Sequence, residues 1–250
     1  GDAGRRLAER LAPYADEHPV VFALPRGGVP VGAEVARSLG APLEVIVSRK
    51  LGAPGQPEFG IGAVAPGGVR ILNERAVRAL DIAEDYLNMI SARESGEVER
   101  CLRLIRGEGR PYPDLNGRTV ILVDDGLATG VTARAALLAL RTLAPRRLVL
   151  AVPVCAPQTA NLLRPETDDL ICLLDPPDLE AIGLWYWNFD QVPDEEVMRL
   201  LEEARRRTAV AASCASLRRM SATCWTQWYP TRTADHKAAV SSKPRSSRDK

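Results

Sequence analysis

The chain has 250 residues, 46% of them hydrophobic and 26% charged, which is enough for one sizeable core and for one or two domains. Its 33 Lys and Arg residues nearly balance its 32 Asp and Glu residues, and the formal net charge of +1 excludes a strongly basic nucleic-acid binder. No apolar run approaches the roughly 18 residues that a membrane-spanning helix needs, so we expect no membrane partner.

Helix-like and strand-like segments alternate over residues 1–207. Short runs of Val, Ile and Leu predict the strands, and amphipathic stretches predict the helices. The first half contains, in chain order, a helix over 3–14, strands over 20–24 and 43–48 with a helix over 29–39 between them, a long loop with short extended pieces over 51–69, and a helical region over 74–106 broken near 80–81. The second half contains a strand over 120–123, a helix over 132–143, a strand over 148–154, a helix over 157–163, a strand over 170–174 and a helix over 194–206. Continuous apolar strands separated by helices predict an α/β fold with a Rossmann-like, mostly parallel sheet covered on both faces.

The last 43 residues differ from the rest in composition. Residues 208–250 contain eight basic and two acidic side chains, a charge of +6, and they show no sustained helical or strand period. We therefore expect a folded domain over 1–207 and a basic, disordered tail over 208–250. A basic arm that grips RNA or another partner is the alternative for this tail.

The cysteines and histidines limit the possible chemistry. Five cysteines lie scattered at positions 101, 155, 172, 214 and 224, which indicates reduced thiols in a cytoplasmic protein. The only histidines are His18 and His236, so a His-rich metal site and a Ser-His-Asp triad are poorly supplied.

The segment 120–132, VILVDDGLATGVT, is the most informative part of the chain. An apolar strand leads directly into Asp124 and Asp125, and then through a small-residue turn into a helix. In an open α/β sheet, ligands bind beyond the carboxyl ends of the strands, where this turn must lie. Exposed amides and the helix N-terminus suit a phosphate, while the paired carboxylates suit vicinal hydroxyls. The pattern therefore predicts a ribose 5-phosphate site. The alternative is a solvated Asp pair before an ordinary helix cap.

Two further segments are expected at the same edge of the sheet. Residues 24–28, LPRGG, follow the first strand, and Arg26 can take a phosphate in a fork while the glycines let the backbone approach a ligand. Residues 48–50, SRK, end the second predicted strand with two cations, and neighbouring residues of a strand point to opposite faces. We expect either Arg49 or Lys50 to face the ligand.

The chain resembles the type I phosphoribosyltransferases, which bind 5-phosphoribosyl-1-pyrophosphate (PRPP) through a segment like 120–132. The stretches LPRGG, SRKLGAPGQPEFGIGAV and PPDLEAIGLWYWNFDQV, together with the long inserted helices, extend this resemblance over the body to an uncharacterised bacterial group of the family. It implies the type I fold, with a small hood and an inserted helical segment.

The resemblance also implies roles for particular residues. PRPP would be bound by Asp124, Asp125, Gly126, Leu127, Ala128, Thr129, Gly130, Val131 and Thr132. The pyrophosphate loop would be Pro25, Arg26, Gly27 and Gly28, with a non-proline cis peptide around Arg26–Gly27. Arg26, Arg49 and Lys50 would be the catalytic cations, and 51–60 would be a mobile lid over the reacting centre. Mg²⁺ would be the cofactor, bound through PRPP and Asp124 or Asp125 rather than by a protein cage.

The acceptor is not readable from the sequence. Trp185, Tyr186 and Trp187 resemble the segment that stacks on the base in 6-oxopurine enzymes, although they could equally cover a sheet edge or a dimer contact. Ala128 stands where those enzymes place an Asp, which weakens a hypoxanthine-guanine assignment. Asn188 replaces an Asp of the relatives, which puts any metal-water role there in doubt.

The resemblance predicts transfer of the ribose 5-phosphate group from PRPP to a small nitrogenous acceptor, with release of pyrophosphate, by a cytoplasmic homodimer that binds no specific nucleic acid. Two alternatives are a PRPP sensor without transferase activity and one module of a larger protein that scaffolds or supplies a partner. The acceptor, the physiological direction, the oligomeric state and the role of the tail stay open.

Overall fold

The computed structural model describes residues 1–228, with side chains described as far as Ala211. The chain divides into two units, residues 1–209 and 210–250, and the first unit contains the fold described below.

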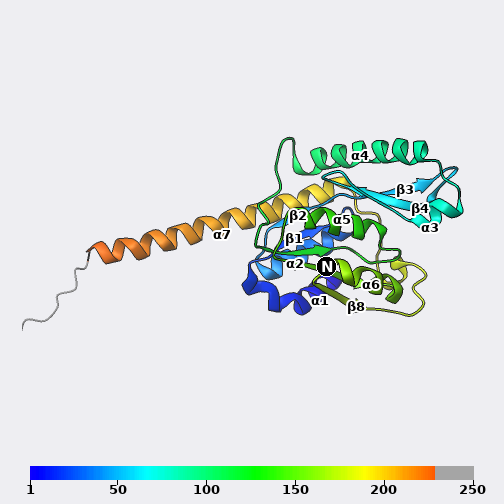
Figure 1. Cartoon of the computed structure of the whole chain (residues 1–250). Coiled ribbons are helices and arrows are strands. Elements are labelled where there is room, and N and C mark those ends of the chain that lie inside the picture. Colours follow the sequence, from blue (N-terminus) through cyan, green and yellow to red (C-terminus); the bar gives the residue numbers. More distant parts are fainter. Residues whose placement is uncertain (229–250) are drawn as a thin grey trace, which may run out of the picture. The chain divides into compact units, whose positions relative to one another are not determined.

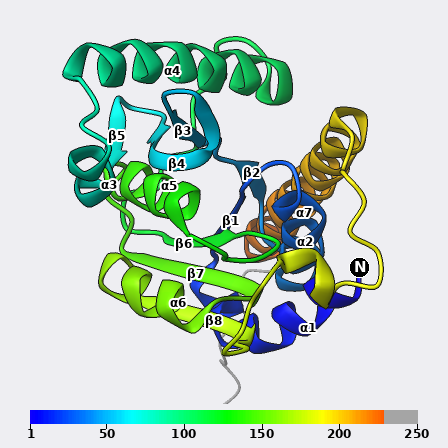
Figure 2. The same ribbon diagram turned by 90° about the vertical axis from the view of Figure 1, so that its right-hand side faces the viewer.

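A five-stranded parallel sheet forms the centre of the first unit (Figures 1 and 2). Its order is β2-β1-β6-β7-β8, and every neighbouring pair is parallel. The strands are β1 (Val20–Ala23), β2 (Leu43–Val45), β6 (Thr119–Val123), β7 (Arg147–Val154) and β8 (Asp169–Leu174). The predicted mostly parallel sheet is confirmed.

Helices cover both faces of this sheet. The helices α1 (Asp2–Leu11), α2 (Gly28–Leu39) and the first turns of α7 (Asp194–Trp228) pack on one face, where Val21 and Ile121 point. The helices α5 (Val131–Arg141) and α6 (Pro157–Leu163) pack on the other face, against Phe22 and Leu122. Because successive strand residues point to opposite faces, an all-apolar strand must be covered twice. Three short 3₁₀ helices complete the unit: η1 (Ala12–Glu17), η2 (Arg164–Glu166) and η3 (Ile182–Trp185).

A second sheet is inserted between β2 and β6, together with two helices. The strands β3 (Arg49–Ala53), β4 (Gln56–Ala65) and β5 (Val69–Leu72) are antiparallel, and α3 (Glu74–Ala79) and α4 (Glu84–Arg106) follow them. Figure 2 shows α4 lying across this sheet. The insertion has its own small core, which includes Leu51, Ile61 and Leu87. The predicted helix break near 80–81 is confirmed.

The prediction of a long loop with short extended pieces over 51–69 is wrong in part, because most of these residues form strands of the second sheet. Its glycines serve the antiparallel pairing instead, because a Cβ on Gly62 would lie 2.3 Å from the Ile71 carbonyl oxygen. Gly55 and Gly67 have positive φ and form the two turns. Gly and Pro are general turn signals, so their density favoured a loop although β-branched residues stand between them. The stretch 51–60 that resembles a lid is therefore part of the β3–β4 hairpin.

Two other boundaries differ from the prediction. The strand expected to end with Ser48–Lys50 stops at Val45, and Arg49 begins β3 of the second sheet. The helix expected over 194–206 continues to Trp228, so the expectation of irregular structure from residue 208 is wrong as far as 228. Ala, Arg and Leu favour a helical backbone even where no apolar face repeats. The rest of the predicted tail, 229–250, lies outside the described residues.

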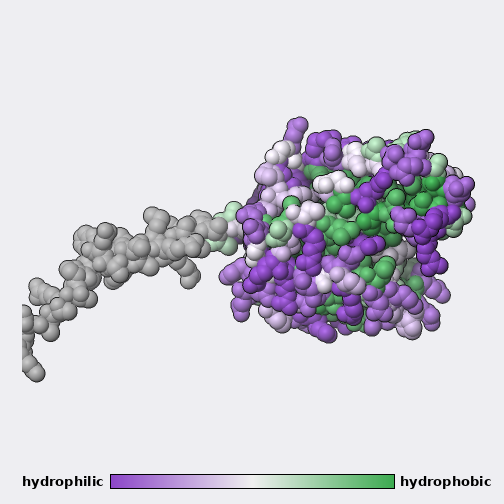
Figure 3. Space-filling model, in the orientation of Figure 1, coloured by the Kyte–Doolittle hydropathy of each residue, from purple (hydrophilic) through white to green (hydrophobic). Residues whose placement is uncertain are grey.

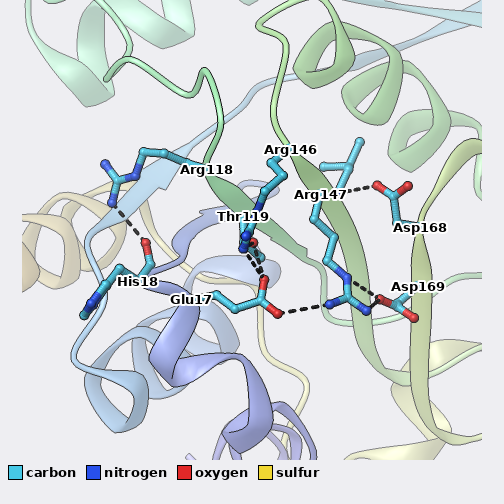
Figure 4. A network of polar contacts seen from close by, with 9 residues as sticks. Glu17, His18, Arg118, Thr119, Arg146, Arg147, Asp168 and Asp169 are labelled. Atoms are coloured by element: carbon cyan, nitrogen blue, oxygen red, sulfur yellow. Dashed lines mark hydrogen bonds and ion pairs between the residues drawn. The ribbon is translucent and has the colours of Figure 1, made fainter.

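A polar network ties together the amino ends of the central strands (Figure 4). The Glu17 carboxylate, just before β1, accepts hydrogen bonds from Thr119 at the start of β6 and from Arg146 and Arg147 at the start of β7. Arg147 also binds Asp169, the first residue of β8, at 2.9 and 2.7 Å. One glutamate thus links three strand starts, at the edge opposite to the acid-containing loop.

The face of this unit seen in Figure 3 carries hydrophilic side chains and an apolar band, which lies over the region of α5 in Figure 1. Patches of this kind often mark association surfaces, but the expected homodimer stays a prediction. Among the described residues, no helix has the length and apolar character needed to cross a membrane.

We predict that Glu17→Gln lowers the free energy of unfolding by about 1–2 kcal/mol at pH 7, because the carboxylate loses charge-assisted hydrogen bonds. The Thr119 hydrogen bond, with the charges of Arg147 and Arg146, lowers the pKa of Glu17 below its ordinary value. The stabilisation is therefore complete above the unfolded pKa of about 4.3 and is lost as the pH falls through the lowered folded value.

Denaturant unfolding at pH 7 and pH 3 measures this difference, with Glu9→Gln on the exposed face of α1 as the matched control. A deficit that is as large at pH 3 as at pH 7 would contradict the assignment.

Candidate functional site

Two loops meet at the carboxyl edge of the central sheet because β1 and β6 are neighbours. The Leu24 N–H donates to the Val123 carbonyl at 3.0 Å, which carries the pairing to the very ends of both strands. A Cβ on Gly27 would lie 1.7 Å from an Asp125 carboxylate oxygen, and a Cβ on Gly28 would lie 2.9 Å from the Val123 carbonyl oxygen. The predicted pyrophosphate loop therefore packs directly on the acid pair, and only glycine leaves room for this contact.

A cis peptide bond lies in the first of these loops. It joins Pro25 to Arg26, one bond before the position Arg26–Gly27 that the resemblance implied. The expectation of a non-proline cis bond in this loop is confirmed, and its exact position is corrected.

The two acids of the second loop are held close together. The Asp125 N–H donates to the Asp124 carboxylate at 2.9 Å. Burial and the charge of Asp125 raise the pKa of Asp124 well above its ordinary value, and burial also raises the pKa of Asp125. A cation or hydroxyl donors bound at this pair would favour the charged forms of the two carboxyls.

The small-residue turn after the acids forms a partly open cradle. Ala128 and Thr129 are exposed, and Gly130 has φ +69° just before α5, where a Cβ would lie 2.5 Å from a Thr159 methyl group. The first amides of α5, from Val131 and Thr132 onward, have no intrahelical partner, as at every helix N-terminus. An anion could be bound here.

Leu127, one of the residues predicted to bind PRPP, belongs to the core of the fold instead. The Leu127 side chain is buried in the core, and its N–H donates to the Val154 carbonyl at 2.9 Å. Its amide is therefore not free for a phosphate. The Thr159 hydroxyl donates to the Ala128 carbonyl and fixes the turn from the α6 side.

The predicted catalytic cations lie in two different places. Arg26 lines a cleft of about 690 Å³ together with Gly27 and Asp125. Arg49 and Lys50 line a separate cavity of about 400 Å³ between the β3–β4 hairpin and α4. The structure therefore brings Arg26 to the acid pair and does not bring Arg49 or Lys50 there.

Each of these three cations has an acidic partner. Arg26 pairs with Asp194, the first residue of α7, at 3.5 Å. Arg49 donates to the buried Glu94 of α4 at 2.8 Å, and Lys50 lies 3.4 Å from the Glu58 carboxylate. A phosphate group would have to compete with these carboxylates.

Residues 182–189, called the aromatic segment below, follow β8 and also reach the cleft. Trp185, Tyr186 and Trp187 all line it, so the three predicted acceptor residues lie beside Asp125. Trp187 is fully exposed and Trp185 is 44% exposed, whereas Tyr186 is partly buried and its hydroxyl donates to the Asp125 main-chain carbonyl. The sequence suggested a stacking role for all three, and the structure separates them.

Several residues of this edge were missed from the sequence. Asp194, Thr159 and Ile182 contact the loops from elements far along the chain. None belongs to a recognisable motif. Only the position of Asp194 at the predicted start of a helix gave a signal, since such positions favour acids.

The donors at this edge fit a magnesium ion only in part. Carboxylate oxygens are hard ligands of the kind that Mg²⁺ prefers. Among the described residues, no group of three acidic, His or Cys side chains could hold a metal ion. Asp124 and Asp125 therefore fit an ion that takes its remaining ligands from a bound phosphate compound and from water.

The comparison with known protein families identifies the family of this chain. The model of the phosphoribosyl transferase domain matches residues 1–184, and the chain belongs to this family.

Two Mycobacterium tuberculosis sequences, each named "Putative phosphoribosyl transferase", are 42% identical over 213 residues, which is 85% of this chain and 48% of theirs. The chain thus spans about half the length of these curated relatives. The crystal structure of TT1426 from Thermus thermophilus is 44% identical, covers 80% of this chain and 95% of its own, and superposes with a TM-score of 0.66. The recognised family and the predicted fold class are thereby confirmed.

We predict that Gly27→Ala destabilises the protein by about 1–3 kcal/mol, because the new methyl group would overlap the Asp125 carboxylate. Thermal unfolding should show a loss of several degrees. Gly96→Ala on α4 is the matched control, since a Cβ there meets nothing within 4 Å. Equal melting temperatures for the two variants would show that the loops are not in contact.

Proposed function

We propose that the chain transfers the 5-phosphoribosyl group from PRPP to a small nitrogenous acceptor and releases pyrophosphate. The observation that carries this proposal is the contact of Gly27 with Asp125, which joins a phosphate-type loop to an acid pair at the edge of the sheet. Family membership supports the use of PRPP in general, and the acceptor and the direction belong to the proposal.

In this proposal, each part of PRPP is bound by a different group of residues at the carboxyl edge of the sheet. Asp124 and Asp125 accept hydrogen bonds from the ribose hydroxyls, while the turn Ala128–Thr132 binds the 5-phosphate. Arg26 exchanges its Asp194 partner for the pyrophosphate and neutralises the leaving group. Magnesium, held by the acid pair and by PRPP, would supply further charge neutralisation at the pyrophosphate.

The reaction is a displacement at the anomeric carbon. The bond from that carbon to the pyrophosphate oxygen breaks, the pyrophosphate keeps the electron pair, and the acceptor nitrogen forms the new bond. The nitrogen then loses its proton to solvent. The chain's contribution is positioning and stabilisation of charge.

The role of Arg49 and Lys50 depends on movement of the β3–β4 hairpin. In the present arrangement they face Glu94 and Glu58. We propose that they reach the pyrophosphate only when the hairpin closes over the cleft, as a lid that excludes water.

The setting of the reaction is also part of the proposal. We propose a cytoplasmic homodimer with the function carried by residues 1–207, independent of membrane and nucleic acid. The free thiols of Cys101, Cys155 and Cys172 support a reducing compartment.

We predict that the double variant Asp124→Asn/Asp125→Asn binds Mg-PRPP at least tenfold more weakly, a loss of about 1.4 kcal/mol. The same variant should melt at a higher temperature at pH 7, because burial and the charge of Asp125 beside Asp124 disfavour the charged carboxyls in the ligand-free fold and raise their pKa values. This gain is absent below the unfolded pKa of about 3.9 and grows as the pH rises towards the folded values.

Calorimetry and thermal unfolding measure the two effects. Unchanged PRPP affinity in a well-folded double variant would remove the acid pair from the site.

A transferase releases pyrophosphate from PRPP, whereas a sensor only binds PRPP. We predict release when Mg-PRPP is mixed with one member of a panel of nucleobases and amines, at a rate well above slow PRPP hydrolysis. A pyrophosphate-coupled assay measures this rate, with Asp124→Asn/Asp125→Asn as the control. Tight PRPP binding without release for any acceptor would favour the sensor.

A further inference from the structure

Tyr186 differs from the two tryptophans beside it. Its ring packs on Phe189, with the centroids 5.1 Å apart, and its hydroxyl donates to the main-chain carbonyl of Asp125 at 2.5 Å. Trp187 is fully exposed and makes no such contact among the described residues. The Tyr186 hydroxyl is therefore engaged with the main chain of the loop that carries Asp124 and Asp125, called the acid loop below.

A second contact joins the same two segments. A Cβ on Gly126 would lie 2.8 Å from an Ile182 methyl carbon, so η3 presses on the residue that follows Asp125. Phe189 in turn occupies the space beside Gly183, at 3.0 Å from a Cβ there. The aromatic segment therefore folds upon itself and against the acid loop.

Asp125 is held from two sides as a result. Gly27 lies against its carboxylate, and Tyr186 holds its carbonyl. Because a carbonyl and the following N–H share one peptide plane, the Tyr186 hydrogen bond limits rotation of the backbone between Asp125 and Gly126. The Asp125 side chain projects from the Cα atom next to this peptide plane, so a fixed plane limits the directions open to the carboxylate.

We propose that Tyr186 is a positioning residue, whose hydroxyl fixes the main chain of Asp125 so that the carboxylate faces the ribose hydroxyls. Trp185 and Trp187 are then the aromatic faces left for a planar acceptor. This inference rests on the proposed function, because it assigns the ribose to the acid pair.

The test uses Tyr186→Phe, which removes only the hydroxyl, and calorimetry in the presence of Mg²⁺ with three probes: PRPP, ribose 5-phosphate and inorganic pyrophosphate. The loss of one hydrogen bond should weaken PRPP and ribose 5-phosphate about fivefold. Pyrophosphate, which has no ribose, should bind as it does to the unchanged chain. Tyr14→Phe, which removes the same hydroxyl group from η1 at the amino edge of the sheet, is the matched control and should leave all three affinities unchanged.

The outcomes are distinct. Weakening confined to the two ribose ligands supports the positioning role. If Tyr186→Phe binds all three probes as tightly as the unchanged chain does, the positioning role is overturned. An equal loss of affinity for all three probes, together with a lower melting temperature, also overturns it, because that result indicates a general structural role. If the unchanged chain binds pyrophosphate but not PRPP, the proposed function itself fails and this inference fails with it.

Discussion

The contact between the two loops at the carboxyl edge of the sheet is the constraint on which the site depends. Gly27 and Gly28 lie so close to Asp125 and to the end of β6 that no side chain fits between them. This closeness follows from the strand order, since β1 and β6 are neighbours and pair up to their last residues. A cationic loop and an acidic loop are thus brought together by backbone pairing, before any ligand is present.

The two edges of the sheet are used for different purposes. At the amino ends, the Glu17 carboxylate forms ion pairs with Arg146 and Arg147 and accepts a hydrogen bond from Thr119. These contacts stabilise the start of three strands. At the carboxyl ends, Asp124 and Asp125 bury like charges beside each other, which costs stability. An arrangement that is unfavourable in the free protein and would be relieved by a ligand is typical of a functional site.

The predicted catalytic cations are paired with carboxylates in the free chain, although only Arg26 lies at the cleft. Arg26 is bound to Asp194 from the start of α7, and Arg49 is bound to Glu94 of α4. The Arg26–Asp194 pair is largely exposed and therefore weak, so a pyrophosphate could displace the carboxylate at little cost. Glu94 is buried and also receives Arg93, so Arg49 is held more firmly. Arg26 thus lies at the cleft with a weakly bound partner, whereas the role proposed for Arg49 at the pyrophosphate requires movement of the insertion.

The sequence by itself determined the central sheet, the helices on its faces and the position of the acid pair, because these follow from local patterns: apolar runs of strand length, helical periodicity, and a motif contained in thirteen consecutive residues. The prediction was less accurate over 51–69, where Gly and Pro residues favoured a loop. In the structure these residues form the turns of an antiparallel sheet and allow close contacts between its strands. Tertiary structure alone decided which side chains meet across long separations. Tyr186 reaches Asp125 over 61 residues, and Asp194 reaches Arg26 from the last described helix. Such contacts depend on the order of the strands and on where the connections between them turn back, and no local pattern records either.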